Sequence, residues 1–206
     1  MPVGEDEATA RRRRRTPEAA QREIIDAAEG LLRERPFREL TVDEVMRRTG
    51  LSRPSFYVYF KDRHDLILRV VQHLQDEILA VAGRWYESLG GGPKILREAL
   101  DGVVGVYGAH GPELRALSDA AVDDRDVEQA YEALVQGFVE VTGRHIEAEM
   151  KAGHITALDA GETAKALVWM TERYLYHSFG PVRRVPTSRV TETLATLWTR
   201  TLYQSS

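Results

Sequence analysis

Apolar residues recur every three or four positions along most of the chain, the spacing that gathers side chains on one face of an α-helix. In the first such segment, Thr16 supplies a capping hydroxyl, and Pro17 suits the first helical position, where no backbone N–H is needed. Pro36 is expected to end this helix, because proline interrupts the ladder of backbone hydrogen bonds. The apolar stripe of the predicted helix comprises Ile24, Ile25, Ala28, Leu31 and Leu32.

A second, shorter helix is predicted from Thr41 to Gly50. Thr41 and Glu44 stand three residues apart, the spacing of a capping box, in which each side chain bonds the backbone N–H of the other residue. Gly50 suits the left-handed backbone conformation that closes a helix. The buried face of this helix comprises Val42, Val45 and Met46.

Two capping residues predict the next pair of helices. Ser52 can cap a third, short helix that runs through Phe60, and Asp62 can cap a long helix that lasts until the break at residues 90–93. The apolar positions of the long helix are Leu66, Ile67, Val70, Val71, Leu74, Ile78 and Leu79.

The remainder of the chain keeps the helical periodicity. We predict helices near residues 94–109, 113–121, 125–152, 160–178 and 187–203, separated by Gly111-Pro112, Asp123-Asp124, Gly153, Gly180-Pro181 and Pro186. No alternating strand-like run and no internal repeat is found. The predicted fold is therefore all-α, with an N-terminal three-helix unit joined to a larger C-terminal helical bundle.

The composition narrows the class of protein. The chain has 206 residues and no cysteine, which excludes a disulfide framework, a thiolate metal site and a cysteine nucleophile. Hydrophobic residues make up 43% and charged residues 29%, as in globular proteins. No apolar stretch approaches the roughly 20 residues that span a bilayer, and the first residues contain no apolar signal core. We therefore expect a soluble, cytoplasmic protein outside the membrane.

Basic residues gather near the N-terminus, although the formal net charge is -4. Residues 1–66 hold 14 of the 28 Lys and Arg residues, which gives this part of the chain a local basic surface of the kind that nucleic-acid binding requires. Residues 1–15 have almost nothing to bury and are predicted to form a disordered basic arm. We interpret its run Arg11–Arg15 as a solvated charge run, with insertion into the minor groove as the alternative.

The stretch TVDEVMRRTGLSRPSFYVYFKDRHDL, residues 41–66, predicts a helix-turn-helix. In that motif the second helix lies in the major groove and its N-terminal side chains contact base edges. Phe56 and Phe60 are expected to turn inward, which leaves Tyr57 and Tyr59 to seek polar partners such as phosphates. Arg53 can bond two acceptors of a guanine. The candidate DNA-binding residues are Thr41, Ser52, Arg53, Pro54, Ser55, Tyr57, Tyr59, Lys61 and Arg63.

This stretch closely resembles the DNA-binding domain of the TetR family of bacterial repressors, and the likeness runs from about Ile24 to Leu68. It includes the aromatic Y-x-Y-F turn of the family and the downstream Leu66. Arg63 stands where the family commonly has lysine, and arginine keeps the charge that grips a phosphate. The resemblance divides the chain into a DNA-binding domain at residues 16–61 and a ligand-binding and dimerisation domain at residues 62–206.

The C-terminal segments 166–179 and 197–203 resemble one branch of that family, whose members carry a long apolar tunnel through each subunit. The resemblance implies a pocket for an apolar small molecule, with plain core packing as the alternative. Val168 and Thr171 stand where members of the branch have two asparagines, so we expect different polar recognition. The candidate ligand-binding residues are Leu96, Val103, Tyr107, Tyr131, Val135, Phe138, Thr142, Val168, Trp169, Thr171, Glu172, Tyr176 and Trp198.

Other titratable residues suggest supporting roles. We favour a structural role for Glu172 over ligand contact, and we expect its neighbour Arg173 to face another side of the helix. His145 and Glu149, four residues apart, suit a surface pair better than a metal site, because no second histidine or cysteine completes one. No nucleophile-base arrangement, phosphate loop or dinucleotide motif is found. We therefore predict no catalytic residue, metal or cofactor, and we do not expect an enzyme.

The last two helices carry more apolar residues than one buried face requires: Leu167, Met170, Leu175, Val190, Leu194 and Leu197. Excess apolar surface indicates a partner interface, with burial inside one subunit as the alternative. Two recognition helices must lie about 34–36 Å apart to enter successive major grooves, so we expect a homodimer joined through these helices.

The sequence as a whole predicts a ligand-responsive transcriptional repressor that an apolar small molecule releases from a palindromic operator in double-stranded DNA. Three alternatives stay open. The first is a regulator whose ligand strengthens DNA binding, and the second is a non-specific DNA-organising protein. The third is a helical enzyme with a decayed DNA-binding module, for which no catalytic constellation is found.

Overall fold

The structure is a computed structural model that describes residues 16–122, 124–180 and 185–203. Over these residues the chain forms eight α-helices, one short 3-10 helix and no strand, so the predicted all-α class is confirmed. The predicted disordered arm at residues 1–15 lies outside the described residues, as do Asp123 and Pro181 of the predicted breaks. The elements are α1 (Pro17–Leu32), η1 (Phe37–Glu39), α2 (Val42–Thr49), α3 (Arg53–Tyr59), α4 (Arg63–Glu87), α5 (Gly92–Ala120), α6 (Arg125–Lys151), α7 (Ala160–Phe179) and α8 (Thr187–Tyr203).

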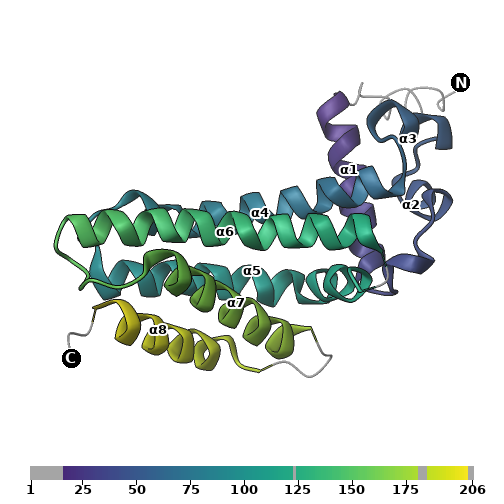
Figure 1. Cartoon of the computed structure of the whole chain (residues 1–206). Helices are drawn as coiled ribbons and strands as arrows, with labels where there is room; N and C mark the ends of the chain where they lie inside the picture. Colours follow the sequence, from purple (N-terminus) through teal and green to yellow (C-terminus); the bar gives the residue numbers. More distant parts are fainter. Residues whose placement is uncertain (1–15, 123, 181–184, 204–206) are drawn as a thin grey trace, which may run out of the picture.

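The arrangement is a long bundle with a small unit at one end (Figure 1). Helices α4, α5 and α6 run side by side along the bundle, and α7 packs against α5 and α6. Helix α8 lies along α5 on the outer side, and its last turn is at the end of the bundle farthest from α1, α2 and α3. No helix of the described residues has both the length and the apolar character needed to cross a membrane.

Most helix starts follow the predicted capping residues. Thr16 Oγ1 accepts from Ala19 N–H at 3.2 Å at the start of α1. Asp62 Oδ1 accepts from the N–H groups of His64 at 2.8 Å and Asp65 at 3.0 Å at the start of α4. These backbone donors, that of Asp65 most strongly, lower the pKa of the Asp62 carboxyl.

One predicted helix end is wrong and one predicted break is confirmed. Helix α1 ends at Leu32, four residues before Pro36, and Pro36 caps the start of η1. The predicted break between helices 94–109 and 113–121 is present, because α5 consists of two helical segments joined at a kink where His110, two residues before Pro112, has a non-helical backbone (φ -113°, ψ 15°). The second half of α5 continues because Leu114 and Leu117 are buried in the core.

The apolar residues of the last two helices are mostly buried inside the subunit. Leu167, Leu175, Val190 and Leu194 all belong to the core, so the predicted apolar excess is wrong for these four residues. They are buried because α7 packs against α5 and α6, and α8 packs against α5 and α7. Leu197 is 43% exposed and Met170 is partly buried at the surface of the bundle.

Polar contacts attach the N-terminal unit to the bundle. Arg33, just after α1, forms an ion pair with Glu113 of α5, whose side chain is fully buried. Glu29 of α1 pairs with His73 Nδ1 of α4 at 2.9 Å. His64, at the start of α4, lies 3.0 Å from Asp124, the capping residue of α6. The position of the small unit therefore depends on α4, α5 and α6 together.

Candidate DNA-binding surface and ligand pocket

The turn between α2 and α3 is held by short-range hydrogen bonds. Thr41 Oγ1 accepts from Glu44 N–H at 3.3 Å, which is one half of the predicted capping box, and it donates to Glu44 Oε2 at 2.8 Å. Gly50 ends α2 with φ 65°, a left-handed conformation that few side chains tolerate. Thr49 Oγ1 then donates to Met46 O at 2.9 Å and accepts from Leu51 N–H at 3.1 Å. These bonds fix the angle at which α3 leaves α2.

Helix α3 has one buried side and one exposed side. The rings of Phe56 and Phe60 are buried, with centroids 5.3 Å apart, so the predicted inward orientation is confirmed. Ser52 begins α3 without bonding its backbone, because its Oγ lies 2.8 Å from Ser55 Oγ instead. The predicted side-chain cap by Ser52 is therefore wrong. Arg53, Pro54, Tyr57 and Val58 are exposed on the other side.

Arg53 already has a partner on the neighbouring helix. Its guanidinium lies 3.3 Å from an Asp43 carboxylate oxygen, and both side chains are more than half exposed. The hydroxyl of Tyr57 first, and the charge of Asp43 second, raise the pKa of Arg53. When Arg53 contacts a base, it would give up its ion pair with Asp43. This pair is exposed to solvent, so breaking it costs little free energy.

The remaining candidate residues differ in availability. Lys61 is exposed, whereas Tyr59 is partly buried against the core. The Arg63 guanidinium lies 5.0 Å from the centroid of the Phe37 ring, a cation–π contact that holds it beside η1. Arg47, with a 75% exposed side chain on α2, is a further cation that the candidate set lacked. Its position in the basic cluster of the sequence was the available signal.

A cavity lies inside the bundle and is lined by α4, α5, α6, α7 and α8. The cavity has a volume of about 70 Å³, more than the roughly 10–15 Å³ that is needed to hold one water molecule. The space fits a thin molecule, and a larger one would have to move the helices apart. The lining residues are Ile78, Ala82, Trp85, Tyr86, Leu96, Ala99, Leu100, Val103, Tyr107, Leu134, Val135, Phe138, Val168, Thr171, Glu172, Leu175 and Trp198.

Nine of the thirteen candidate ligand-binding residues line this cavity. Four lie outside it: Tyr131 and Thr142 contact lining residues from behind, Trp169 is 36% exposed, and the Tyr176 hydroxyl donates to Asp119 at 2.6 Å. The prediction that these four residues line the pocket is therefore wrong for this cavity. The packing of α7 turns Trp169 and Tyr176 outward, and Tyr131 and Thr142 lie behind residues that form the wall. Sequence reasoning missed all four lining residues of α4, namely Ile78, Ala82, Trp85 and Tyr86. Only Ile78 belongs to the predicted apolar stripe of the long helix, and the helical spacing from Ile78 to Ala82, Trp85 and Tyr86 was the available signal for the other three.

The polar groups of the cavity come mainly from α7. Trp198 Nε1 donates to Thr171 Oγ1 at 2.9 Å, so this hydroxyl is already engaged as an acceptor. The Tyr131 hydroxyl donates to Glu172 Oε1 from α6. Burial first, then the neighbouring Tyr107 and Glu172, raises the pKa of Tyr131, which keeps it a neutral donor.

One prediction about charged residues is confirmed and one is wrong. Glu172 is buried and Arg173 is exposed, so the two face different sides of α7 as predicted, and the long side chain of Arg173 brings its Nε to 3.4 Å from Glu172 Oε2. His145 and Glu149 are not a surface pair: both are buried, and Glu149 accepts from Gly90 N–H at 2.7 Å and pairs with His154 at 3.1 Å. Glu149 thereby ties the α4–α5 loop to the end of α6.

One group of possible metal ligands occurs within the described residues. His64, Asp124 and Asp126 each place a ligand atom within 4.8 Å of the others. Asp124 Oδ1 accepts from the N–H groups of Asp126 and Val127, and Asp124 Oδ2 lies 3.0 Å from His64. Capping of α6 and the contact with α4 account for this grouping.

Comparison with known proteins gives two family matches. Residues 24–70 match the family described as bacterial regulatory proteins, tetR family, and residues 96–204 match the C-terminal domain of transcriptional regulator EthR. The chain is 31% identical over 202 residues to the HTH-type transcriptional regulator EthR of Mycobacterium tuberculosis, which covers 93% of this chain and 92% of that protein.

Solved structures agree on the fold. A putative TetR-family transcriptional regulator from Syntrophomonas wolfei superposes with a TM-score of 0.78 at 14% identity, covering 89% of this chain and 94% of the other. AibR in complex with isovaleryl coenzyme A and operator DNA superposes with a TM-score of 0.66 at 13% identity, covering 86% and 97%. At these identities the likeness establishes a shared architecture of helix-turn-helix unit and helical bundle.

Proposed function

Because the chain belongs to the TetR family of bacterial transcriptional regulators, we propose that it is a homodimeric repressor released from a palindromic operator by an apolar small molecule. The family consists of ligand-responsive, DNA-binding regulators rather than enzymes. The single observation that carries the proposal is that α4 both follows the recognition helix α3 directly and forms one wall of the cavity. Operator DNA lies in the bacterial cytoplasm, and we propose that location for the protein.

We assign DNA binding to residues 16–61 and ligand binding with dimerisation to residues 62–206. Ser52, Arg53, Pro54 and Ser55 are proposed to contact base edges, and Tyr57, Tyr59 and Lys61 the phosphates. Thr41 and Arg63 are proposed to contact phosphates at the edges of the surface. The exposure of Arg53 and Tyr57 above a buried Phe56 supports this assignment.

The ligand would act through α4. A molecule larger than the cavity must displace its walls, and Ile78, Ala82, Trp85 and Tyr86 would transmit that displacement along α4 to α3. The ligand releases DNA only if its affinity is higher for the conformation that binds DNA weakly than for the conformation that binds DNA tightly. A coupling of about 1–3 kcal/mol corresponds to a factor of roughly 5 to 150 in operator affinity.

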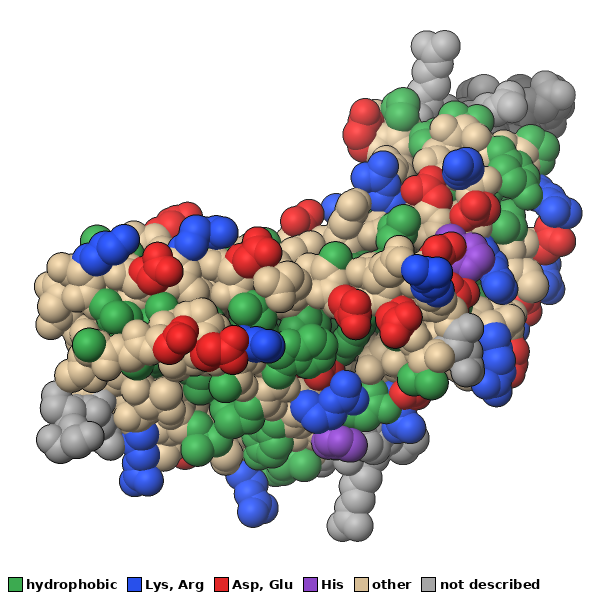
Figure 2. Space-filling model, in the orientation of Figure 1, with side chains coloured by type: hydrophobic (Ala, Val, Ile, Leu, Met, Phe, Trp, Pro, Cys, Tyr) green, Lys and Arg blue, Asp and Glu red, His purple; other side chains and the backbone are tan. Residues whose placement is uncertain are grey.

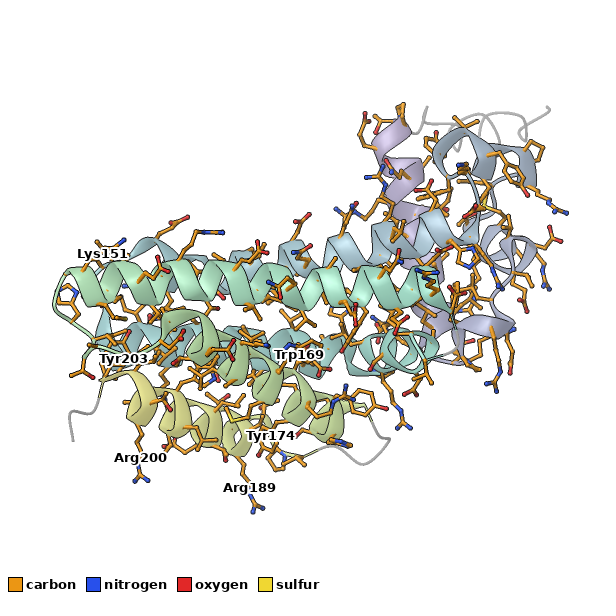
Figure 3. All side chains as sticks on the ribbon, viewed as in Figure 1. Lys151, Trp169, Tyr174, Arg189, Arg200 and Tyr203 are labelled. Carbon is orange, nitrogen blue, oxygen red and sulfur yellow. The ribbon has the colours of Figure 1, made fainter. Side chains whose placement is uncertain are left out.

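The outer face of α7 and α8 supports the homodimer. Hydrophobic side chains gather over these helices on the surface of the bundle (Figure 2). Arg189 and Arg200 of α8 project away from the bundle (Figure 3), Trp169 of α7 is 36% exposed, and Leu197 is among the most exposed leucines of the described residues. An apolar centre with charged side chains at its edge is typical of a subunit interface.

Leu197→Glu is expected to convert the dimer to monomers, because it would bury two carboxylates near each other across a two-fold interface. Sedimentation velocity should show half the mass of the dimer. Operator affinity should fall because each monomer would bind one half-site independently. Leu89→Glu, at a still more exposed leucine after α4, is the control and should stay dimeric. A Leu197→Glu protein that remained dimeric would remove α8 from the interface.

The function is tested by fluorescence anisotropy with labelled DNA from upstream of the gene for the protein. We expect tight binding that is weaker at high salt and absent with a shuffled duplex. Arg53→Ala should relax the preference at one base position, by about 1–3 kcal/mol of discrimination, whereas Lys61→Ala should weaken binding to all sequences alike. If Arg53→Ala kept the same sequence preference, residues other than Arg53 would be responsible for contacting the bases.

The same assay separates the alternatives. Equal affinity for the native and shuffled duplexes would indicate a non-specific DNA-organising protein. A ligand that lowers the anisotropy of a preformed complex would support release, and one that raises it would indicate a regulator strengthened by its ligand.

A further inference from the structure

Glu172 places a carboxylate in the wall of an otherwise apolar cavity. The residue is 5% exposed, and its Oε2 atom is buried without a hydrogen-bond partner. The cavity wall next to it consists of aliphatic and aromatic side chains from five helices. A buried carboxylate oxygen without a donor is costly, so this atom favours any ligand that supplies one.

The protein itself satisfies only half of this carboxylate. The Tyr131 hydroxyl donates to Oε1, and it has a single proton to give. On the other side, Arg173 Nε lies 3.4 Å from Oε2 without hydrogen-bond geometry. Arg173 is half exposed, and its guanidinium carbon lies 4.8 Å from the centroid of the Tyr176 ring, which directs it toward the surface.

No positive charge faces Glu172 from the cavity, since the lining residues include no lysine, arginine or histidine. Tyr107 lines the cavity nearby, and after burial the charge of Glu172 is the largest cause that raises the pKa of this phenol. The cavity therefore combines a negative end with apolar walls.

We propose that the effector is an apolar amine whose protonated nitrogen donates a hydrogen bond to Glu172 Oε2 while its hydrocarbon part lies against the apolar walls. The inference rests on the proposed function and names the ligand class of that site. An ammonium group adds the attraction between opposite charges to the hydrogen bond, so an amine should bind this carboxylate more tightly than an alcohol with the same hydrocarbon part. A carboxylate should bind least, because like charges repel.

The test is calorimetric titration of the full chain with octylamine, octanol and octanoate, which differ only in the polar group. We expect octylamine to bind about tenfold more tightly than octanol, because only the amine adds a positive charge to the hydrogen bond with the carboxylate. In Glu172→Gln, which keeps an acceptor for Tyr131, octylamine should lose this advantage while octanol affinity stays the same. Glu162→Gln, at an exposed glutamate of the same helix, should behave as the unchanged protein and so excludes attraction of amines to the surface.

Comparison of the three ligands on the unchanged protein decides the proposal even if Glu172→Gln folds poorly. Equal affinities for amine and alcohol, tighter binding of octanoate, or no binding of any of the three would overturn it. The proposed function fails by a different result, namely no sequence-selective DNA binding in the anisotropy assay. An operator complex released equally well by octanol and octylamine would therefore reject the amine and leave the repressor intact.

Discussion

Phe56→Ala is expected to abolish operator binding and to destabilise the N-terminal unit by about 3–5 kcal/mol, the usual range for removing a buried phenylalanine ring. Phe56 is fully buried, and its ring contacts those of Tyr57 and Phe60 at centroid distances of 5.3 Å. Helix α3 is a seven-residue helix and is marginal without this anchor. Globular proteins have only roughly 0.05–0.15 kcal/mol of stability per residue, so the loss approaches the whole stability of a unit this small.

Hydrogen–deuterium exchange would locate the damage. In Phe56→Ala the amides of α2 and α3 should exchange far faster, whereas those of α6 and α7 should keep their protection. Val58→Ala is the matched control, because Val58 lies on the same helix and is 75% exposed. Fast exchange in both variants, or tight operator binding by Phe56→Ala, would mean that Phe56 does not hold the recognition helix.

Gly111→Ala is expected to lower the free energy of unfolding of the bundle by about 1–3 kcal/mol, the cost of forcing extra atoms into a packed interior. A Cβ atom at this position would lie 2.5 Å from the backbone oxygen and 2.8 Å from the carbonyl carbon of Phe179. These are backbone atoms at the end of α7, so no side-chain rotation can make room. The helices must separate, and we expect the larger values of the range.

Gly105→Ala gives the opposite result in the same helix. A Cβ atom there would meet nothing within 4 Å, so the variant should gain about 0.5–1 kcal/mol from the lower flexibility of alanine in the unfolded chain. Urea unfolding followed by circular dichroism measures both changes. Equal midpoints for the two variants would show that α5 and α7 can move apart freely at Gly111.

Features set by neighbouring residues could be predicted from the sequence. The caps by Thr16, Thr41 and Asp62 depend on side chains two or three positions from the groups that they bond. The inward turn of Phe56 and Phe60 follows in the same way, because a short helix has one side to bury. The all-α class needed only the periodicity of the apolar residues.

Features set by distant packing could not be predicted. Trp198 and Trp169 have the same chemistry, yet Trp198 lines the cavity and Trp169 is exposed. The packing of α7 and α8 against their neighbouring helices determines which face of each is covered. Pro112 indicated the break that is found at His110, but the burial of Leu114 and Leu117 beyond the kink depends on contacts with other helices. The burial of His145 and Glu149 depends on the loop at Gly90, far away in sequence.

The ion pair between Arg33 and Glu113 limits how the two parts of this protein can be recombined with those of relatives. Consider a hybrid that joins the N-terminal unit of another regulator to this bundle. The fully buried Glu113 would lose its partner Arg33 unless the other regulator also has a basic residue at the matching position. The mirror hybrid, with this N-terminal unit on a foreign bundle, is tolerant, since Arg33 is half exposed and water can solvate it. Transplantation of DNA specificity should therefore succeed more readily in one direction than in the other.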